Sequence, residues 1–386
     1  MLRSGSAILR SVACIDDLRR LAHQRVPSDF MGYYESGSYS ETTLAANLRD
    51  LQNIKIRQRV LAGAANRNQI QTVLGETQPL PLVLGPVGLS GMAYRDGEIA
   101  AARAAEKAGI PYTLSTLSIC SIEDVAEAVS KPFWFQLYFM KDRGFVADLI
   151  ARARKANCSA LVLTVDLQVL GQRHRDVRSG MTVPPRIKLS TIGRIASKPA
   201  WIANVLMGKR KTFGNVAGRI PGTENLLSYM DWINSQFDQA LSWDDVAWIR
   251  EQWPGKLIIK SIMDADDARM AVKSGASAIV VSNHGGRQLD GAASSISMLP
   301  RIIDAVGDDV EVHFDGGIRS GQDVFRALAL GARACWLGRS YLYGLCAAGE
   351  TGVTKAIDLI AKELDVTMAL AGVRTIDQIS RDCLEN

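Results

Sequence analysis

The residue types best suited to acid–base chemistry lie together in residues 282–291, which read Ser-Asn-His-Gly-Gly-Arg-Gln-Leu-Asp-Gly. His284 can accept a proton near neutral pH, and Arg287 can hold a carboxylate through two parallel hydrogen bonds. Gly285 and Gly286 let the backbone between them turn sharply and pass close to a ligand. A base beside an anion-binding arginine indicates chemistry on a small acid. A polar surface turn is the simpler alternative.

Eight apolar runs of strand length recur along the chain, and His284 follows the sixth of them. Continuous apolar runs are typical of parallel strands buried on both faces. The runs cover residues 82–84, 110–114, 133–137, 160–165, 257–260, 278–282, 310–314 and 334–337. Helical patterns lie between several of them, over residues 96–108, 121–129, 265–273 and 321–330. The alternation predicts an α/β fold, a (β/α)8 TIM barrel, with a doubly wound open sheet as the alternative.

The segments outside this alternation suggest one domain with additions to the barrel. The chain has 386 residues, 47% of them hydrophobic, which is enough for one large core. Residues 1–80 are predicted to form an N-terminal helical cap, residues 81–350 the barrel, and residues 351–386 a C-terminal helical segment. A long insertion follows strand 4, and it includes residues 177–223.

Residues 177–223 form a basic segment with nine arginines and lysines and no acidic residue. The segment carries +9 within a chain of net charge +5, so the remainder carries −4. Four apolar residues of a predicted helix share one face: Trp201, Ile202, Val205 and Leu206. Flanked by basic residues, such a helix can bind an anionic membrane surface. A solvated loop over the active site is the alternative, and an acidic remainder argues against nucleic-acid binding.

Other sequence features narrow the class of protein. The six cysteines are scattered without a C-x-x-C pair, which predicts reduced thiols and no metal site. No uncharged apolar run approaches ~18 residues, so no transmembrane helix is expected. The N-terminus is a poor secretory signal because it lacks an apolar core, although a transit peptide is an alternative.

Small or polar residues follow every predicted strand, at the barrel end where active sites lie. After the last two strands, glycines with Arg319 and Arg339 suggest a phosphate site. The eight strand ends carry, in chain order, residues 85–88, Ser115, Gln136 with Tyr138, Thr164 with Asp166, Lys260, His284 with Arg287, residues 315–319, and Gly338 with Arg339.

Five stretches together make the chain resemble the FMN-dependent L-2-hydroxy acid dehydrogenases and oxidases from about Cys14 to the C-terminus. They are residues 33–37 (Tyr-Tyr-Glu-Ser-Gly), 135–138 (Phe-Gln-Leu-Tyr), 163–166 (Leu-Thr-Val-Asp), 282–290 and 314–317 (Phe-Asp-Gly-Gly). Residues 85–92 and 114–118 are most similar to the branch of bacterial respiratory L-lactate dehydrogenases.

The resemblance implies a catalytic role for four residues. His284 would be the base that takes a proton from the substrate, and Asp166 would stabilise the imidazolium. Tyr138 would bind the substrate oxygen, and Lys260 would lie where negative charge collects on the reduced flavin. The substrate carboxylate would be held by Tyr33, Arg173 and Arg287. Proton removal from the α-carbon to give a carbanion, and removal from the hydroxyl with hydride transfer, are both open.

FMN is the cofactor that the resemblance implies, and no metal is implied. The FMN-binding residues would be Pro86, Val87, Gly88, Ser115, Gln136, Thr164, Lys260, Ser282, Asp315, Gly316, Gly317, Arg319, Gly338 and Arg339. Leu117 and Met140 are candidates for the walls that set substrate size.

The implied reaction is oxidation of an L-2-hydroxy acid, with L-lactate to pyruvate favoured. Electrons would pass to a membrane quinone or, since no haem-binding domain precedes the barrel, to a separate cytochrome. Gly88 weakly favours a dehydrogenase, because peroxide-forming oxidases of the family tend to carry alanine there. The expected protein is a homotetramer bound peripherally to the cytoplasmic face of the bacterial inner membrane, or cytoplasmic if the basic segment is only a loop. The alternatives are a soluble oxidase that reduces O2 to H2O2 and a non-redox barrel that binds a phosphorylated ligand.

Overall fold

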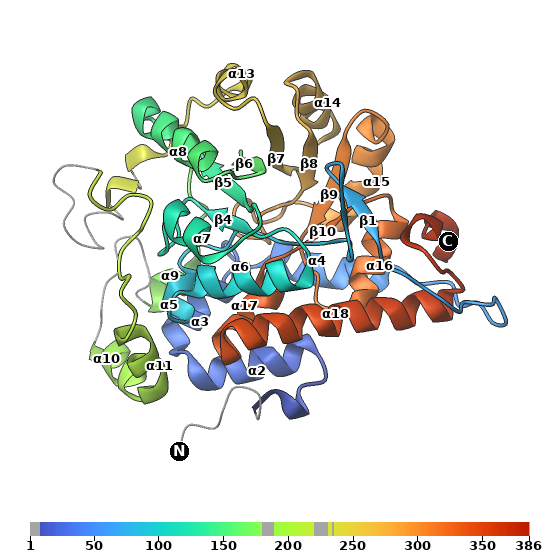
Figure 1. Cartoon of the computed structure of the whole chain (residues 1–386), viewed down its shortest axis with the longest axis horizontal. Coiled ribbons are helices and arrows are strands. Elements are labelled where there is room, and N and C mark those ends of the chain that lie inside the picture. The colour runs from blue at the N-terminus through green and yellow to red at the C-terminus, as the bar shows by residue number, and fades with distance from the viewer. Residues whose placement is uncertain (1–7, 180–188, 220–230, 234, 386) are drawn as a thin grey trace.

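Eight parallel strands form the central sheet of the computed structural model, in the order β3-β10-β9-β8-β7-β6-β5-β4 (Figure 1). The structure describes residues 8–179, 189–219, 231–233 and 235–385. A parallel bridge between Leu84 and Tyr112 joins the two edge strands and closes the barrel. The predicted (β/α)8 barrel is therefore confirmed, and the open-sheet alternative is wrong.

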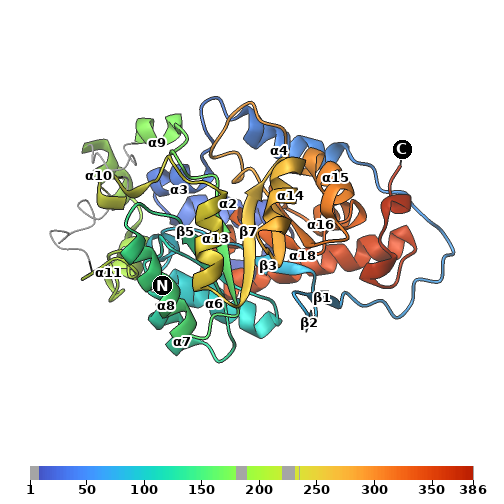
Figure 2. The same cartoon turned by 90° about the horizontal axis from the view of Figure 1, so that it is seen from above.

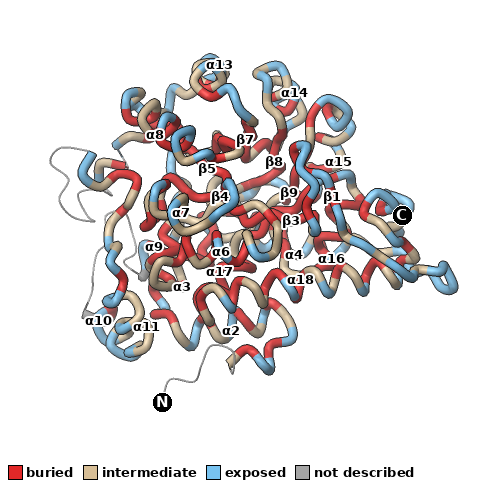
Figure 3. The backbone as a smooth tube through the Cα atoms, viewed as in Figure 1, coloured by how far each residue is buried: buried red, intermediate tan, exposed pale blue. Residues whose placement is uncertain are grey.

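Each barrel strand overlaps the apolar run that predicted it. The strands are β3 (Leu82–Leu84), β4 (Thr113–Ser115), β5 (Trp134–Tyr138), β6 (Ala160–Thr164), β7 (Lys256–Ile262), β8 (Ala278–Val281), β9 (Glu311–Asp315) and β10 (Cys335–Leu337). Figure 3 shows these strands as the buried centre of the molecule, with exposed residues on the surrounding helices.

Alternation along the strands explains how an apolar barrel carries a polar site. Side chains two residues apart in a strand point to the same face. In β6, Ala160 and Val162 belong to the apolar cluster inside the barrel, and Thr164 is next on that face. In β8, Val280 belongs to the same cluster and Ser282 follows it. The inward face thus changes from apolar to polar at the C-terminal end of the barrel.

A two-stranded antiparallel sheet closes the opposite end of the barrel. It consists of β1 (Gln71–Val73) and β2 (Glu76–Gln78). Between them, Leu74 donates its backbone N–H to the Glu311 carboxylate at 2.9 Å, and the side chains of Val73 and Leu74 join the interior cluster. The prediction of a helical cap over residues 1–80 is therefore wrong for its last third.

The N-terminal helices cover the site end of the barrel and its neighbouring helices. They are η1 (Leu9–Ser11), α2 (Ile15–Arg25), α3 (Ser28–Glu35) and α4 (Thr42–Asn53). α2 packs against α17 (Arg339–Ala348) and α18 (Glu350–Ala371). Asp290 accepts hydrogen bonds from Thr43 N at 2.8 Å and Thr42 Oγ1 at 2.7 Å, at the start of α4. This contact joins the cap to the His284 loop.

The remaining helices surround the barrel or follow it. They are α5 (Ser90–Ala93), α6 (Gly97–Ala108), α7 (Ile122–Ala128), α8 (Arg143–Lys155), α13 (Trp243–Gln252), α14 (Ala265–Lys273), α15 (Ser295–Val306), α16 (Gly321–Ala329), η2 (Ile376–Gln378) and η3 (Arg381–Cys383). Ser121 and Asp124 form a capping box at the start of α7.

The described part of the insertion after β6 includes short helices that lie away from the C-terminus. They are α9 (His174–Ser179), α10 (Leu189–Ala196) and α11 (Pro199–Leu206). Both views show α10 and α11 on one side of the molecule, with the C-terminus on the other (Figures 1 and 2). Across the described ranges, no helix has the length and apolar character needed to span a bilayer.

Candidate active site

One pocket at the C-terminal ends of the strands collects most of the predicted site residues. Those that line it are Tyr33, Pro86, Val87, Gly88, Ser115, Tyr138, Thr164, Arg173, Lys260, His284, Arg287, Asp315, Gly316, Gly317, Arg319, Gly338 and Arg339. Asp166, Gln136 and Ser282 lie just behind this lining, where each contacts a residue in it. Residues from all eight strand ends therefore meet in one place, as barrel topology requires.

His284 and Asp166 form a hydrogen-bonded pair across two strand ends. The distance from His284 Nδ1 to Asp166 Oδ1 is 2.9 Å. Burial tends to raise the pKa of Asp166, but the neighbouring His284 and Lys260 outweigh it, and the pKa is lowered. Asp166 is therefore an anion at neutral pH. It orients the imidazole through Nδ1, which leaves Nε2 as the ring nitrogen available for proton transfer.

The backbone at His284 has an unusual conformation. Its φ is +58°, in the left-handed region that residues with a side chain rarely adopt, and Gly285 and Gly286 continue with φ of +66° and +75°. A Cβ on Gly285 would lie 2.7 Å from Arg339 Nη1, and one on Gly286 would lie 2.6 Å from Leu44 N. The glycine pair thus lets the loop carry His284 back over the pocket while the cap and Arg339 approach closely.

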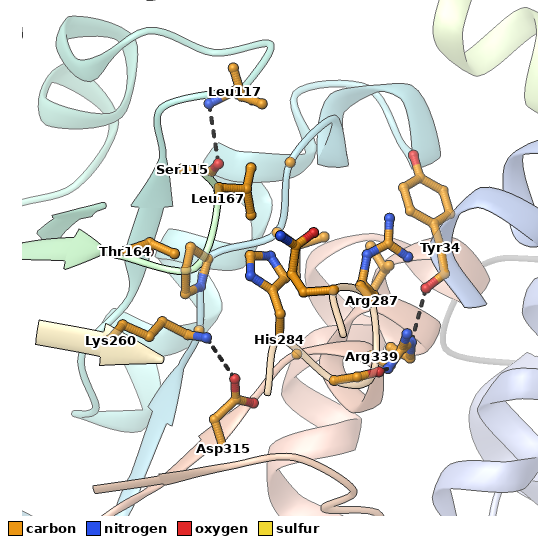
Figure 4. A pocket seen from close by; sticks show the side chains of 18 of the residues that line it. Tyr34, Ser115, Leu117, Thr164, Leu167, Lys260, His284, Arg287, Asp315 and Arg339 are labelled. Atoms are coloured by element: carbon orange, nitrogen blue, oxygen red, sulfur yellow. Dashed lines mark hydrogen bonds and ion pairs between the residues drawn. The ribbon is translucent and has the colours of Figure 1, made fainter. Parts of the chain in front are cut away.

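Lys260 lies in a second polar cluster on the pocket floor. Its Nζ is 2.8 Å from Asp315 Oδ2 (Figure 4). The same Nζ is 2.9 Å from Ser282 Oγ. Ser282 Oγ also donates to Asp315 Oδ2 at 2.7 Å. Burial raises the pKa of Asp315, but Lys260 more than offsets this and the pKa is lowered. A register irregularity in β7 after Lys260 is of the kind often found beside active sites.

The last carbonyls of α3 hold two of the pocket arginines. Arg287 Nη1 donates to Tyr33 O at 2.8 Å and Ser36 O at 2.9 Å. Arg339 donates to Tyr34 O and Ser36 O, both at 3.0 Å. A helix C-terminus offers unpaired carbonyls and partial negative charge. Within the described part of the chain no carboxylate forms an ion pair with either guanidinium group, so their positive charge is left for a ligand.

These arginines lie in surroundings that favour a bound anion. Burial, together with Arg173, lowers the pKa of Arg287 to about 9. Burial and Arg319 lower the pKa of Arg339 to about 10. The cations are thus destabilised by lost solvation and by one another, and an anion would relieve both effects. Tyr33 lies close to both Arg287 and Arg173. Its ring centre is 5.1 Å from Arg287 Cζ and 5.5 Å from Arg173 Cζ.

The pocket fits the expected FMN on two counts. Among the described residues, the buried atoms Gln136 Nε2 and Thr164 Oγ1 have no hydrogen-bond partner, as expected where the polar edge of a flavin ring belongs. At the other end, α17 begins after Gly338 without a side-chain cap, and Arg319 and Arg339 line the pocket beside it. A helix N-terminus with two arginines is suited to a phosphate.

Apolar residues that sequence reasoning largely missed form one wall of the pocket. They are Leu117, Leu167, Leu170, Phe213, Ile233 and Phe237. Of these, only Leu117 was predicted, whereas the other candidate, Met140, is fully buried outside the lining. Phe237 packs edge-on against Tyr138, with ring centres 6.3 Å apart. The three residues Phe213, Ile233 and Phe237 come from the insertion, where no motif marked them.

The helix predicted to carry an outward apolar face is partly turned inward. Trp201 donates its indole N–H to Met92 O at 3.0 Å and packs against Phe30 with ring centres 4.9 Å apart. The prediction that Trp201 shares an outward face is therefore wrong. Leu206 and Met207 at the end of α11 are 63% and 68% exposed, so the outward apolar surface is smaller than predicted and centred on them.

Ion pairs with the body of the protein neutralise part of the basic segment. Arg194 pairs with Asp29 at 2.8 Å, and Arg219 with Asp148 at 2.9 Å. Arg210 bridges Asp96 and Asp124 at 2.8 and 2.7 Å. Arg186 and Lys188 lie outside the described residues. Acidic residues in the remainder of the chain thus pair directly with this segment. The sequence had shown only that the two parts carry opposite net charges.

Comparisons with known proteins agree with this site. Residues 22–386 match the family model described as FMN-dependent dehydrogenase. The chain is 48% identical to an L-lactate dehydrogenase of Caulobacter sp. (strain K31), covering 97% of this chain and 98% of the relative. An L-lactate dehydrogenase of Stenotrophomonas maltophilia (strain R551-3) is also 48% identical, covering 97% and 99%.

Solved structures support the same assignment. The crystal structure of the monotopic membrane protein (S)-mandelate dehydrogenase is 35% identical and aligns with a TM-score of 0.93, covering 98% of this chain and all of that one. A mandelate oxidase structure with benzoyl-formic acid is 35% identical with a TM-score of 0.81, covering 97% and 98%. The chain is therefore an FMN-binding oxidoreductase, the non-redox alternative is set aside, and it belongs to the FMN-dependent dehydrogenase family.

Proposed function

We propose that this enzyme oxidises L-lactate to pyruvate and passes the electrons to an acceptor other than oxygen. The observation that carries the proposal is the His284–Asp166 pair in the same pocket as Arg287, because it places a base next to an anion site. Full-length similarity to proteins named L-lactate dehydrogenase supports lactate as the substrate.

Arg287 binds the substrate carboxylate, and this contact sets the position of the reacting carbon. Tyr33 and Arg173 lie near Arg287 and help it to hold the carboxylate. With the carboxylate fixed, His284 takes one of the two protons that the alcohol loses. Ionised Asp166 stabilises the imidazolium that results. Tyr138 donates a hydrogen bond to the substrate oxygen, since burial raises the pKa of its hydroxyl and keeps it protonated.

FMN, when bound, would accept the two electrons and the second proton that the alcohol loses. Lys260 would provide a fixed positive charge close to the flavin, where reduction adds negative charge. Residues 86–88, Ser115, Gln136 and Thr164 would hold the ring. Asp315, Gly316, Gly317, Arg319, Gly338 and Arg339 would hold the ribityl chain and phosphate, and Ser282 binds Lys260 and Asp315.

The direct test is anaerobic flavin bleaching by a panel of L-2-hydroxy acids. L-lactate should reduce the bound flavin faster than glycolate, (S)-mandelate or longer hydroxy acids. If (S)-mandelate were the better substrate, lactate would be the wrong assignment while the reaction class would stand. A protein whose flavin none of these acids reduces would contradict the proposed reaction.

A quinone or a separate cytochrome is proposed as the electron acceptor, and a soluble oxidase is the competing function. An added Cβ at Gly88 would lie in ordinary van der Waals contact with Leu117 O at 3.4 Å, so crowding alone does not require the glycine. Pre-reduced enzyme should reoxidise faster with a short-chain quinone than in air-saturated buffer. Peroxide release at the rate of substrate turnover in air would support the oxidase instead.

Peripheral binding to the cytoplasmic face of the bacterial inner membrane is proposed through the basic segment. Support comes from exposed Leu206 and Met207 beside Lys209 and Lys211 and from the similarity to a protein described as monotopic. Sedimentation with anionic vesicles should fall when Leu206 and Met207 are replaced by serine. Unchanged sedimentation would contradict the assignment of this surface.

A homotetramer is also proposed. Exposed apolar side chains lie on two segments that run together, with Val60 and Leu61 on one and Val366 and Leu370 on α18. Clustered exposed apolar residues are typical of contact surfaces between chains. Light scattering should give a mass four times that of the 41.9 kDa chain, and a monomer would contradict the proposal.

A further inference from the structure

Residues 208–219, in the middle of the insertion, are built into the body of the protein. Phe213 and Val216 are buried, and Arg210 is bound to Asp96 and Asp124 at the starts of α6 and α7. Gly214 donates its N–H to Ser118 O at 3.1 Å, and an added Cβ there would lie 2.5 Å from Ser121 N. These contacts join residues 208–219 to the loop that follows β4.

Asn215 makes most of the polar contacts in this junction and is fully buried. Its amide nitrogen donates to Ser118 Oγ at 3.0 Å, and more weakly to Thr116 O at 3.3 Å and Ser115 O at 3.4 Å. Its amide oxygen accepts from Ile122 N at 2.9 Å. A single side chain therefore holds both ends of the 115–122 loop.

The same loop connects the parts of the site proposed to contact the flavin ring. Ser115 Oγ accepts from Leu117 N at 3.1 Å (Figure 4). It also donates to Gln136 Oε1 at 3.2 Å. Leu117 O in turn accepts from Leu89 N at 2.9 Å, which ties in the loop that carries Val87 and Gly88. A shift of the 115–122 loop would move these groups together.

We infer that Asn215 is a positioning residue for the cofactor: it fixes the 115–122 loop so that Ser115, Gln136 and the loop of residues 86–88 present a preformed surface to FMN. The inference rests on FMN as the cofactor and is independent of the substrate and the acceptor. Loss of the amide would leave buried carbonyls at Ser115 and Thr116 without this donor, which the loop can remedy only by moving.

The principal test is Asn215→Asp, which keeps the size of the side chain and an oxygen acceptor but removes the donor. Apoprotein is titrated with FMN, and the visible circular dichroism of the bound flavin is recorded. We expect the dissociation constant for FMN to rise by about tenfold, the size of effect of one unsatisfied buried group, with an altered flavin spectrum. An unchanged dissociation constant and spectrum in the folded variant would overturn the inference.

Val216→Ala is the matched control, because Val216 is equally buried and adjacent but makes no side-chain hydrogen bond to the loop. It should lower the melting temperature without changing FMN affinity or the flavin spectrum. If Asn215→Asp does not fold, Ser118→Ala, which removes one acceptor of the amide, decides the matter. It should weaken FMN binding in the same direction, and unaltered binding would then contradict the role. No substrate is needed, so a wrong substrate assignment would leave these results unaffected.

Discussion

The strand ends of the barrel and the insertion after β6 both line the pocket, but different interactions hold them. Strand-end residues are aligned by the parallel ladder, in which Ser115 pairs with Gln136, and Thr164 pairs with Tyr138 on one side and Lys260 on the other. The insertion reaches the pocket through side-chain contacts such as those of Asn215 and through isolated backbone contacts such as the Met140–Phe237 bridge. The comparison separates a framework set by a continuous ladder of backbone bonds from a wall that depends on a few scattered contacts.

The insertion itself divides at about residue 208. Residues 189–207 expose apolar side chains at Ile192, Leu206 and Met207, whereas residues 208–219 include fully buried Asn215 and Val216. Both parts are basic, so charge does not distinguish them. The difference teaches that the basic segment contains two structural units, of which only the first is suited to a role away from the active site.

Replacing the strand-end base should have the largest effect. His284→Asn removes the base, and asparagine tolerates the left-handed backbone at this position. Flavin reduction by L-lactate should fall by about 10³-fold, measured by anaerobic stopped-flow, while FMN stays bound. His174→Ala, at an exposed histidine of α9, should keep the rate near that of the wild type. Fast reduction in the His284 variant would show that the base lies elsewhere.

Replacing Asp166, the partner of the base, should cause the second-largest loss in the rate of flavin reduction. Asp166→Asn leaves the imidazolium without a counter-charge and allows the wrong tautomer, so the reduction rate should fall by about 10²-fold or more. Asp290→Asn is a matched control, because Asp290 lies in the same loop as His284 but its carboxylate binds Ser40 and the start of α4 rather than the imidazole. Equal effects of the two substitutions would mean that the Asp166 contact is structural.

A change in the insertion wall should alter selectivity more than rate. Phe237→Ala opens space beside Tyr138, so the ratio of kcat/KM for (S)-mandelate to that for L-lactate should rise by about tenfold. Phe145→Ala removes a buried phenylalanine that packs on Trp232 outside the pocket, and the ratio should not change. If this ratio did not change in the Phe237 variant, the insertion wall would not determine substrate selectivity.

The framework side can be tested through Glu98, which holds the loops after β3 and β4. Its Oε1 accepts from Gly91 N at 2.9 Å and Ile119 N at 3.1 Å. Burial raises its pKa, with partial offset from these bonds. The folded protein therefore keeps this proton at pH values where the unfolded chain has lost it, and the free energy of unfolding falls as pH rises above about 4.3, the unfolded value.

Glu98→Gln should remove this dependence. The difference in melting temperature between the variant and the wild type should therefore be larger at pH 8 than at pH 5, by about 2 °C or more in favour of the variant. Scanning calorimetry of the FMN-bound protein at both pH values measures it. Glu127→Gln, at an exposed position of α7, should leave the slope as in the wild type. A steeper decline with pH in the Glu98 variant would reverse the sign of the argument.

The smallest catalytic effect is expected from the first part of the insertion. When residues 189–207 are replaced by a flexible linker, reduction of an artificial dye should change by less than about threefold, as for surface changes away from a site. Vesicle binding should be lost. A deletion that extends to residue 218 removes Phe213 and Asn215 and should impair FMN binding. Equal dye activity after both deletions would contradict the division at residue 208.

The framework was predictable from sequence because its signals are local. An apolar run followed by a polar residue identifies both a strand and its site end, as Ala278 to Ser282 illustrate. Lys260, His284 and Arg287 were found in this way, and the family resemblance then supplied their expected roles and added Tyr33 and Arg173.

The remaining features depend on contacts between distant segments, which local patterns do not reveal. Asn215 lies in a stretch without a motif, and only the fold brings it to Ser118. The periodicity around Trp201 correctly predicted a helix. The side of this helix that is buried is set by Phe30, which belongs to the N-terminal cap and packs on Trp201. The strands of the 71–78 hairpin are three residues each, too short for alternation to be recognised.

The turn at the end of α3 makes the cofactor and substrate ends of the pocket interdependent. Ser36 O accepts hydrogen bonds from both Arg287 and Arg339, so the proposed carboxylate and phosphate sites share one backbone atom. Any movement of this turn on binding one ligand changes the affinity for the other, and thermodynamic linkage makes the factor equal in both directions. If FMN binding moves this turn, loading with FMN would also tune how tightly the enzyme holds its acid substrate.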